Sequence, residues 1–235
     1  MSTDDKPGIE HLDNAFVADL AGDQLDLAIS EYENALALGI PPDKEIVARY
    51  SLGKVYSQRA FQTDLPQEQI VQLPDWRRAE QEMEKALTLD RAGIGYFSTP
   101  LGRSLLGRFD LICSYAGTAI GKQDPRAAIE YLESRVEMCE YLSSSPLLDS
   151  LLELGAYQFD IDNRERAVAS WQRIVSAEPV GLPGLEDDSR EKGIREHAAE
   201  NIQTAQSPAK DTPSRSGCLG VVAALCCIVL FLCCN

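Results

Sequence analysis

The sequence LLELGAYQFDIDNRERAVASWQRIVSAEP, residues 151–179, has the pattern of two amphipathic helices joined by a short polar turn. Small residues stand where the two helices must touch, and bulky apolar residues follow them at helical spacing. The residues of this ladder are Leu154, Gly155, Ala167, Trp171, Ile174 and Pro179. The stretch therefore predicts a helix-turn-helix packing unit, not an active site.

The same alternation of small and large residues recurs in the first half of the chain. Helical spacing predicts helices over residues 25–38, 43–60 and 76–89. Pro74 and Asp75 suit the start of the last of these helices, with Asp75 as its N-cap. The residues expected to pack these helices together are Ala28, Tyr32, Ala35, Leu52, Gly53, Tyr56, Ala79, Met83 and Ala86.

This ladder resembles the tetratricopeptide repeat (TPR), whose motif is leucine-glycine in the first helix, alanine early in the second and a terminal proline. The resemblance implies an all-α fold, a right-handed solenoid of antiparallel helix pairs with a capping helix, over residues 9–206. Residues 61–75 delay the second helix of one pair and are interpreted as an insertion. Residues 1–8, small and acidic, are expected to be disordered.

The resemblance also implies a binding surface. In this family the first helices line a concave groove that takes an extended peptide or a partner helix. Carrying its positions over to this chain gives Val47, Tyr50, Lys54, Ser57, Asp149, Leu152, Ala156 and Phe159. Family members that clamp a C-terminal carboxylate have asparagine where this chain has Lys54 and Ala156, which argues against that clamp here.

Composition limits the kind of partner. The chain has 235 residues and a formal net charge of -15 at pH 7. This charge argues against nucleic acid, because binding phosphates requires clustered lysine and arginine. A basic partner, or solubility alone, explains the acidity better. The N-terminus has neither a basic region nor an apolar run, so we expect no secretory signal and a domain that faces the cytosol.

The C-terminal stretch predicts membrane attachment. Residues 217–235 carry no charge, and a helix over most of them would be about 27 Å long, close to the hydrocarbon thickness of a bilayer. Residues 207–216 read as a Ser/Pro-rich linker, and their Lys210 and Arg215 favour a single-pass tail anchor with the domain in the cytosol. The alternative is a buried core helix, which would keep one polar face.

Three further features of the tail leave alternatives open. Cys218 stands where the apolar run meets the linker, a position suited to acylation. Gly220 and Ala224 form a small-xxx-small pair that would let two tails associate, although such pairs also arise by chance. The cysteine pairs further along are explained as polarisable apolar filling, and we expect no metal site.

Residues with catalytic potential are sparse. His11 and His197 lie in charged helical stretches and are expected to be solvated, and Cys113 and Cys139 to be buried as small hydrophobes. Residues 160–163 suggest a turn and lack the glycine of a calcium loop. No nucleophile elbow, phosphate loop or dinucleotide loop is present. We therefore expect no catalytic residue and no cofactor.

These patterns favour a membrane-anchored TPR-like adaptor or scaffold that binds a protein or peptide partner. A second hypothesis is a structural or assembly subunit of a larger membrane complex, associating through its tail. An enzyme would need a cluster of titratable groups in a pocket, which sequence alone does not reveal.

Overall fold

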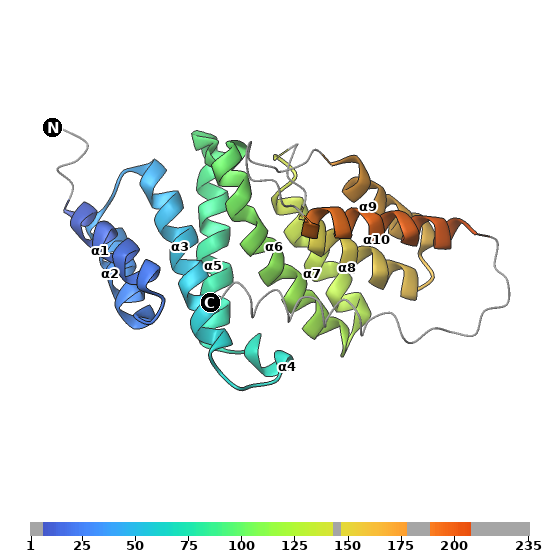
Figure 1. Ribbon diagram of the computed structural model, residues 1–235, viewed down its shortest axis with the longest axis horizontal. Coiled ribbons are helices and arrows are strands. Elements are labelled where there is room, and N and C mark those ends of the chain that lie inside the picture. Colours follow the sequence, from blue (N-terminus) through green and yellow to red (C-terminus); the bar gives the residue numbers. More distant parts are fainter. Residues whose placement is uncertain (1–6, 143–146, 178–188, 208–235) are drawn as a thin grey trace. The chain divides into compact units, whose positions relative to one another are not determined.

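The computed structural model describes residues 7–142, 147–177 and 189–207, and these residues form an all-α fold (Figure 1). The chain divides into two compact units, Met1–Phe109 and Asp110–Asn235. The α-helices are α1 (Gly8–Ala21), α2 (Leu25–Leu38), α3 (Pro42–Phe61), α4 (Gln67–Ile70), α5 (Pro74–Leu89), α6 (Pro100–Gly121), α7 (Pro125–Met138), α8 (Leu148–Asp160), α9 (Arg164–Ser176) and α10 (Ser189–Gln206). A π-helical turn (Asp90–Ile94) and a 3-10 turn (Tyr96–Ser98) separate α5 from α6.

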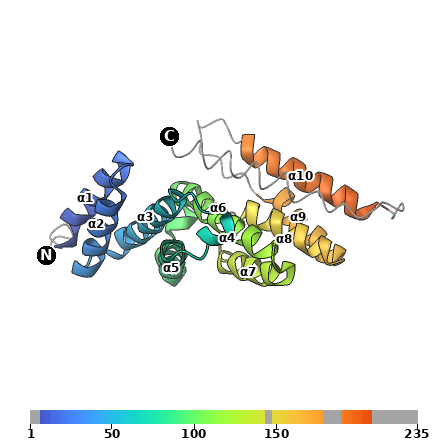
Figure 2. The ribbon, with the colours of Figure 1, turned by 90° about the horizontal axis from the view of Figure 1, so that it is seen from below.

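In the first unit, α1 packs against α2 and α3 against α5, as Figures 1 and 2 both show. The contact between α1 and α2 is made by alanines that are fully buried, with Tyr32 between them. The Phe16 ring meets the Tyr32 ring edge to face, with 5.7 Å between ring centroids. Small residues thus bring the helix backbones together, and aromatic rings fill the remaining space.

The second pair of this unit is built on Gly53. A side chain there would overlap Met83 and the Ala79 carbonyl of α5, so glycine lets α3 and α5 approach closely. At the far end of α3, the Phe61 ring meets the buried Trp76 ring at 5.3 Å. Between these two helices, residues 62–73 contain the short helix α4, whose Ile70 is buried.

In the second unit, α8 packs against α9, and both also contact α10 (Figure 2). Gly117 and Gly121 of α6 lie against Leu132 of α7 and Tyr157 of α8 respectively. On α10, Ala198 is fully buried and belongs to the same core cluster as Trp171. Glycine and alanine therefore mark helix contacts in this unit as well.

Two details of the sequence interpretation need correction. Helix α5 begins at Pro74, two residues earlier than expected, and Leu73 occupies the N-cap position without a side-chain cap. Asp75 does not cap the helix; its carboxylate accepts two hydrogen bonds from Arg59, both at 2.7 Å. The fork of an arginine is a stronger partner for this carboxylate than the backbone N–H groups of its own helix.

Among the described residues, no helix is both long and apolar enough to span a membrane. The predicted anchor at residues 217–235, with Cys218, Gly220 and Ala224, lies outside the described residues, as does Pro179. Most of the predicted linker, from residue 208 onward, also lies outside them.

Candidate functional site

The predicted groove positions of α3 differ in accessibility. Val47 and Lys54 are partly exposed, whereas Tyr50 and Ser57 are buried. The Tyr50 hydroxyl donates to the Leu105 carbonyl, and Ser57 Oγ donates to the Lys54 carbonyl at 2.7 Å. Tyr50 and Ser57 therefore stabilise the interior of the first unit and do not present a surface to a partner.

Lys54 is held by an acidic neighbour. Its Nζ lies 2.7 Å from Oδ2 of Asp19, a carboxylate on α1 whose side chain is 7% exposed. The same Oδ2 also accepts from the Tyr32 hydroxyl at 3.3 Å. The ammonium of Lys54 is thus already neutralised, which leaves its aliphatic stem as the more available part of the side chain.

The groove positions of α8 divide in a similar way. Leu152 is buried, while Ala156 and Phe159 are partly exposed. The Phe159 ring tilts against Trp171, with centroids 6.0 Å apart, and the Arg164 guanidinium lies over its other side at 5.5 Å. Two partly exposed apolar positions therefore remain on this helix.

Asp149, the fourth groove position of α8, belongs to a buried acidic cluster. Arg190 of α10 donates to its carboxylate. Burial raises the pKa of Asp149 well above its usual range, and the nearby Asp110 carboxylate raises it further. One turn along α8, burial raises the pKa of Glu153 to about 7. Burial therefore favours the protonated form of both Asp149 and Glu153.

Asp110 itself caps α8 from another helix. Its two carboxylate oxygens accept from the backbone N–H groups of Asp149 and Ser150, each at 2.8 Å. Ser150 Oγ donates to the same carboxylate at 2.6 Å. An acidic side chain of α6 therefore satisfies donors of the first turn of α8, where a negative charge is favourable.

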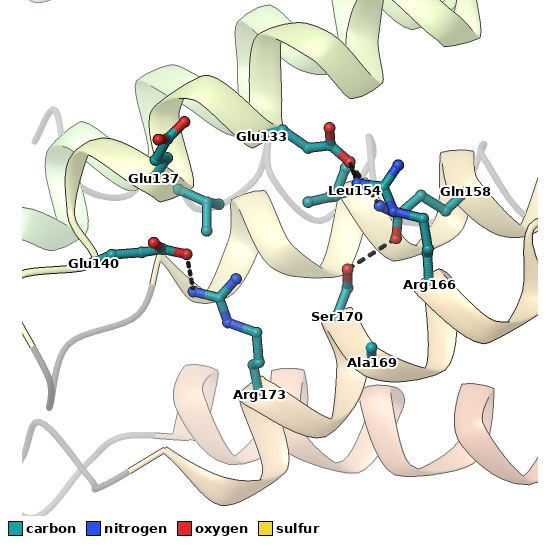
Figure 3. Close-up of a pocket in the computed structure, with 10 residues that line it drawn as sticks. Glu133, Glu137, Glu140, Leu154, Gln158, Arg166, Ala169, Ser170 and Arg173 are labelled. Atoms are coloured by element: carbon teal, nitrogen blue, oxygen red, sulfur yellow. Dashed lines mark hydrogen bonds and ion pairs between the residues drawn. The ribbon is translucent and has the colours of Figure 1, made fainter.

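A pocket of about 340 Å³ opens between α7, α8 and α9 (Figure 3). Acidic side chains of α7 and of the turn after it form one wall, and arginines of α9 form part of the opposite wall. The residues that line it are Glu133, Val136, Glu137, Glu140, Leu154, Gln158, Arg166, Ala169, Ser170 and Arg173. This volume is at the small end of the range typical of ligand sites.

Ion pairs join the two walls of the pocket at both ends. Arg166 lies 2.7 Å from Glu133, and Arg173 lies 3.6 Å from Glu140. Between these pairs, the Ser170 hydroxyl donates to the carboxamide of the buried Gln158 at 2.8 Å (Figure 3). The Gln158 amide in turn donates to Glu133 at 3.1 Å, so the polar groups at the base are satisfied.

His11 and the two cysteines take structural positions. His11 Nδ1 lies 2.8 Å from the Glu31 carboxylate, so this histidine is not simply solvated. Cys113 and Cys139 are buried, as the sequence predicts. Within residues 7–142, 147–177 and 189–207, no group of three potential metal ligands comes together.

The sequence patterns did not predict the pocket or the acidic cluster. A signal for the pocket was present, because Glu133 and Glu140 are seven residues apart, as are Arg166 and Arg173. That spacing places Arg166 and Arg173 on one face of α9, while Glu140 lies in the turn just beyond α7. No comparable signal links Asp110 to Ser150, because the two belong to different helices.

Comparison with protein-family models, curated proteins and solved structures yields no match.

Proposed function

We propose that this chain is a TPR-like adaptor that holds a protein or peptide partner at a membrane. The observation that carries the proposal is a contact repeated in both units. A glycine of a first helix lies against a bulky side chain of a second helix, Gly53 against Met83 and Gly155 against Trp171. Such repeated helix pairs are the building blocks of right-handed solenoids, whose concave faces bind extended peptides.

The accessible groove positions suit a peptide of mixed character. Val47, Ala156 and Phe159 offer apolar contact, and Lys54 offers its stem beside a paired ammonium. The formal net charge of -15 favours a partner with basic residues. In this proposal the chain has no catalytic role and binds no cofactor.

Blocking the groove tests this part of the proposal. Val47→Asp and Ala156→Asp place a charge at one groove position in each unit, and Ser30→Asp and Gln172→Asp place the same charge at exposed positions on α2 and α9. Partners recovered with the full-length chain, identified by mass spectrometry, should be lost with the groove variants and kept with the controls. Equal recovery with all four variants would remove the groove from the proposal.

We assign membrane attachment to residues 217–235, with the helical domain facing the cytosol. The support is the uncharged apolar run and the basic residues Lys210 and Arg215 before it. Carbonate extraction of fractionated membranes is the direct measurement. The chain should stay in the membrane pellet. Release as an intact soluble protein would contradict membrane attachment.

A second candidate function is a structural or assembly subunit of a larger membrane complex. Gly220 and Ala224, four residues apart in the apolar run, favour it, because such pairs allow close helix packing in lipid. They would also allow self-association, and Cys218 would be available for acylation. Replacing the tail with an unrelated anchor separates the candidates: an adaptor keeps its partner, and a subunit loses its complex.

A further inference from the structure

The walls of the α7–α9 pocket form an incomplete ladder of ion pairs. The Glu133–Arg166 and Glu140–Arg173 pairs are seven residues apart in both segments. On α9 this is two helical turns or about 10 Å, whereas Glu140 lies in the turn that follows the end of α7. The first pair joins α7 to α9, and the second joins the turn after α7 to α9 (Figure 3). On α9 this spacing leaves room for one more cation, one turn from each arginine.

The acidic half of a middle pair is present and the basic half is missing. Glu137 stands on α7 between Glu133 and Glu140, and among the described residues no ion pair or hydrogen bond reaches its carboxylate. The corresponding positions of α9 are Ala169 and Ser170. Because these side chains are short, the place of a third arginine is the open volume of the pocket.

We propose that this pocket receives an arginine side chain from a protein partner, which completes the ladder. The guanidinium would lie between Glu137 and Glu140, and its stem would lie over the buried side chains Val136 and Leu154. An apolar floor with an acidic wall matches the two parts of an arginine side chain. The planar guanidinium also pairs with carboxylates through two parallel hydrogen bonds, which lysine does not do.

The polar groups at the base of the pocket already have hydrogen-bond partners. Gln158 is 2% exposed and uses its carboxamide with Ser170 and Glu133. The lining residues include three glutamates and two arginines. Both arginines already have carboxylate partners. An incoming anion would therefore meet an uncompensated carboxylate, whereas a cation would neutralise it.

This pocket is separate from the groove of the proposed function. Its α8 residues, Leu154 and Gln158, each follow a groove position, Leu152 and Ala156, by two residues. Two residues turn a helix by about 200°, so the pocket and the groove use opposite sides of α8. The α7–α9 pocket would add a second contact for the same partner or for another one.

The test uses the full-length chain in neutral detergent and a blocked tripeptide, alanine–arginine–leucine. The matched probe replaces arginine by citrulline, which has nearly the same shape and no charge. Two-dimensional amide NMR should show saturable shifts at Glu137, Ala169 and Ser170 with the arginine peptide and none with citrulline. Equal shifts with both peptides, or no saturable shift at all, would overturn the proposal.

Variants make the assignment specific. Glu137→Gln should weaken the arginine peptide by about tenfold, which corresponds to about 1.4 kcal/mol, and Ala169→Arg should abolish its shifts by filling the pocket. Glu130→Gln removes the same charge from α7 outside the pocket and should change nothing. An equal loss with Glu130→Gln would show general charge attraction and contradict the proposal. Val47→Asp should not change binding of the arginine peptide. This result therefore stands even if the groove does not bind a partner.

Discussion

Gly155 of α8 lies directly against the indole ring of Trp171 on α9, and a methyl group at Gly155 would overlap the ring atoms. The indole Nε1 donates to the Leu152 carbonyl at 3.3 Å, so α8 both makes room for the ring and binds its N–H group. The absence of a side chain at Gly155 is therefore what allows these two helices to meet.

Gly155→Ala should lower the free energy of unfolding by about 1–3 kcal/mol, because the ring must shift or the helices must separate. Gly193→Ala is the matched control, since no atom lies within 4 Å of a side chain at that exposed position of α10. It should raise stability by about 0.5–1 kcal/mol, the usual gain from glycine to alanine in a helix. Urea denaturation measures both, and two changes of the same sign would contradict the packing argument.

Asp110→Ala should uncap α8 at long range. The backbone N–H groups of Asp149 and Ser150 lose their acceptor, which costs about 1–2 kcal/mol. Hydrogen exchange at these two amides should accelerate. Asp124→Ala removes the cap of α7 instead, which contacts Arg126 and Ala127, and should leave exchange at Asp149 and Ser150 unchanged.

The stability of the chain should fall between about pH 4.5 and pH 7 partly because of Glu153. Burial raises its pKa from 4.5 to about 7, so the folded chain binds the proton more tightly than the unfolded chain. Ionisation in the unfolded chain then favours unfolding as pH rises. At about 1.4 kcal/mol per pH unit, the full loss is roughly 3 kcal/mol.

Glu153→Gln removes this titration and should flatten the fall in the thermal unfolding midpoint over the same pH range. Glu130→Gln replaces an exposed glutamate and should keep the slope of the original chain. If the slope is unchanged in Glu153→Gln, the carboxyl does not titrate as its burial implies.

Arg59→Lys should lower the free energy of unfolding by about 1 kcal/mol although it keeps the positive charge. Arg59 joins Asp75 through two hydrogen bonds of 2.7 Å and also pairs with Asp26 of α2 at 2.5 Å. Lysine cannot form both bonds to Asp75 at once. A double-mutant cycle with Asp75→Asn isolates the pair, and Arg77→Lys serves as an exposed control on α5; a coupling energy of zero would refute the assignment.

The positions of several helices could be read from the sequence, because their signals are local. Apolar periodicity with glycine and proline at the ends placed α2 at residues 25–38, the range found in the structure. The helix expected at 43–60 extends one residue further at each end, as Pro42–Phe61. The glycines at helix contacts were also recognisable from the sequence. Gly53 lies against Met83 and Gly155 against Trp171, each on the next helix of its pair.

The partners of the polar side chains were not predictable in the same way. Asp75 was interpreted as a local cap, but the packing of α3 on α5 brings Arg59 to it. Tyr50 and Ser57 were placed in a groove, and the contacts of the folded unit bury them. Each outcome depends on which neighbouring helix covers a given face.

The sequence by itself determined that this chain is helical, where several of its helices lie, and that its last residues are apolar, because these properties follow from neighbouring residues. Only the tertiary structure decided that Asp110 caps α8 and that Glu137 stands between two ion pairs at the edge of a pocket. Those relationships join residues of different helices. They depend on the angle and depth at which the helices pack, which the full set of side chains determines together.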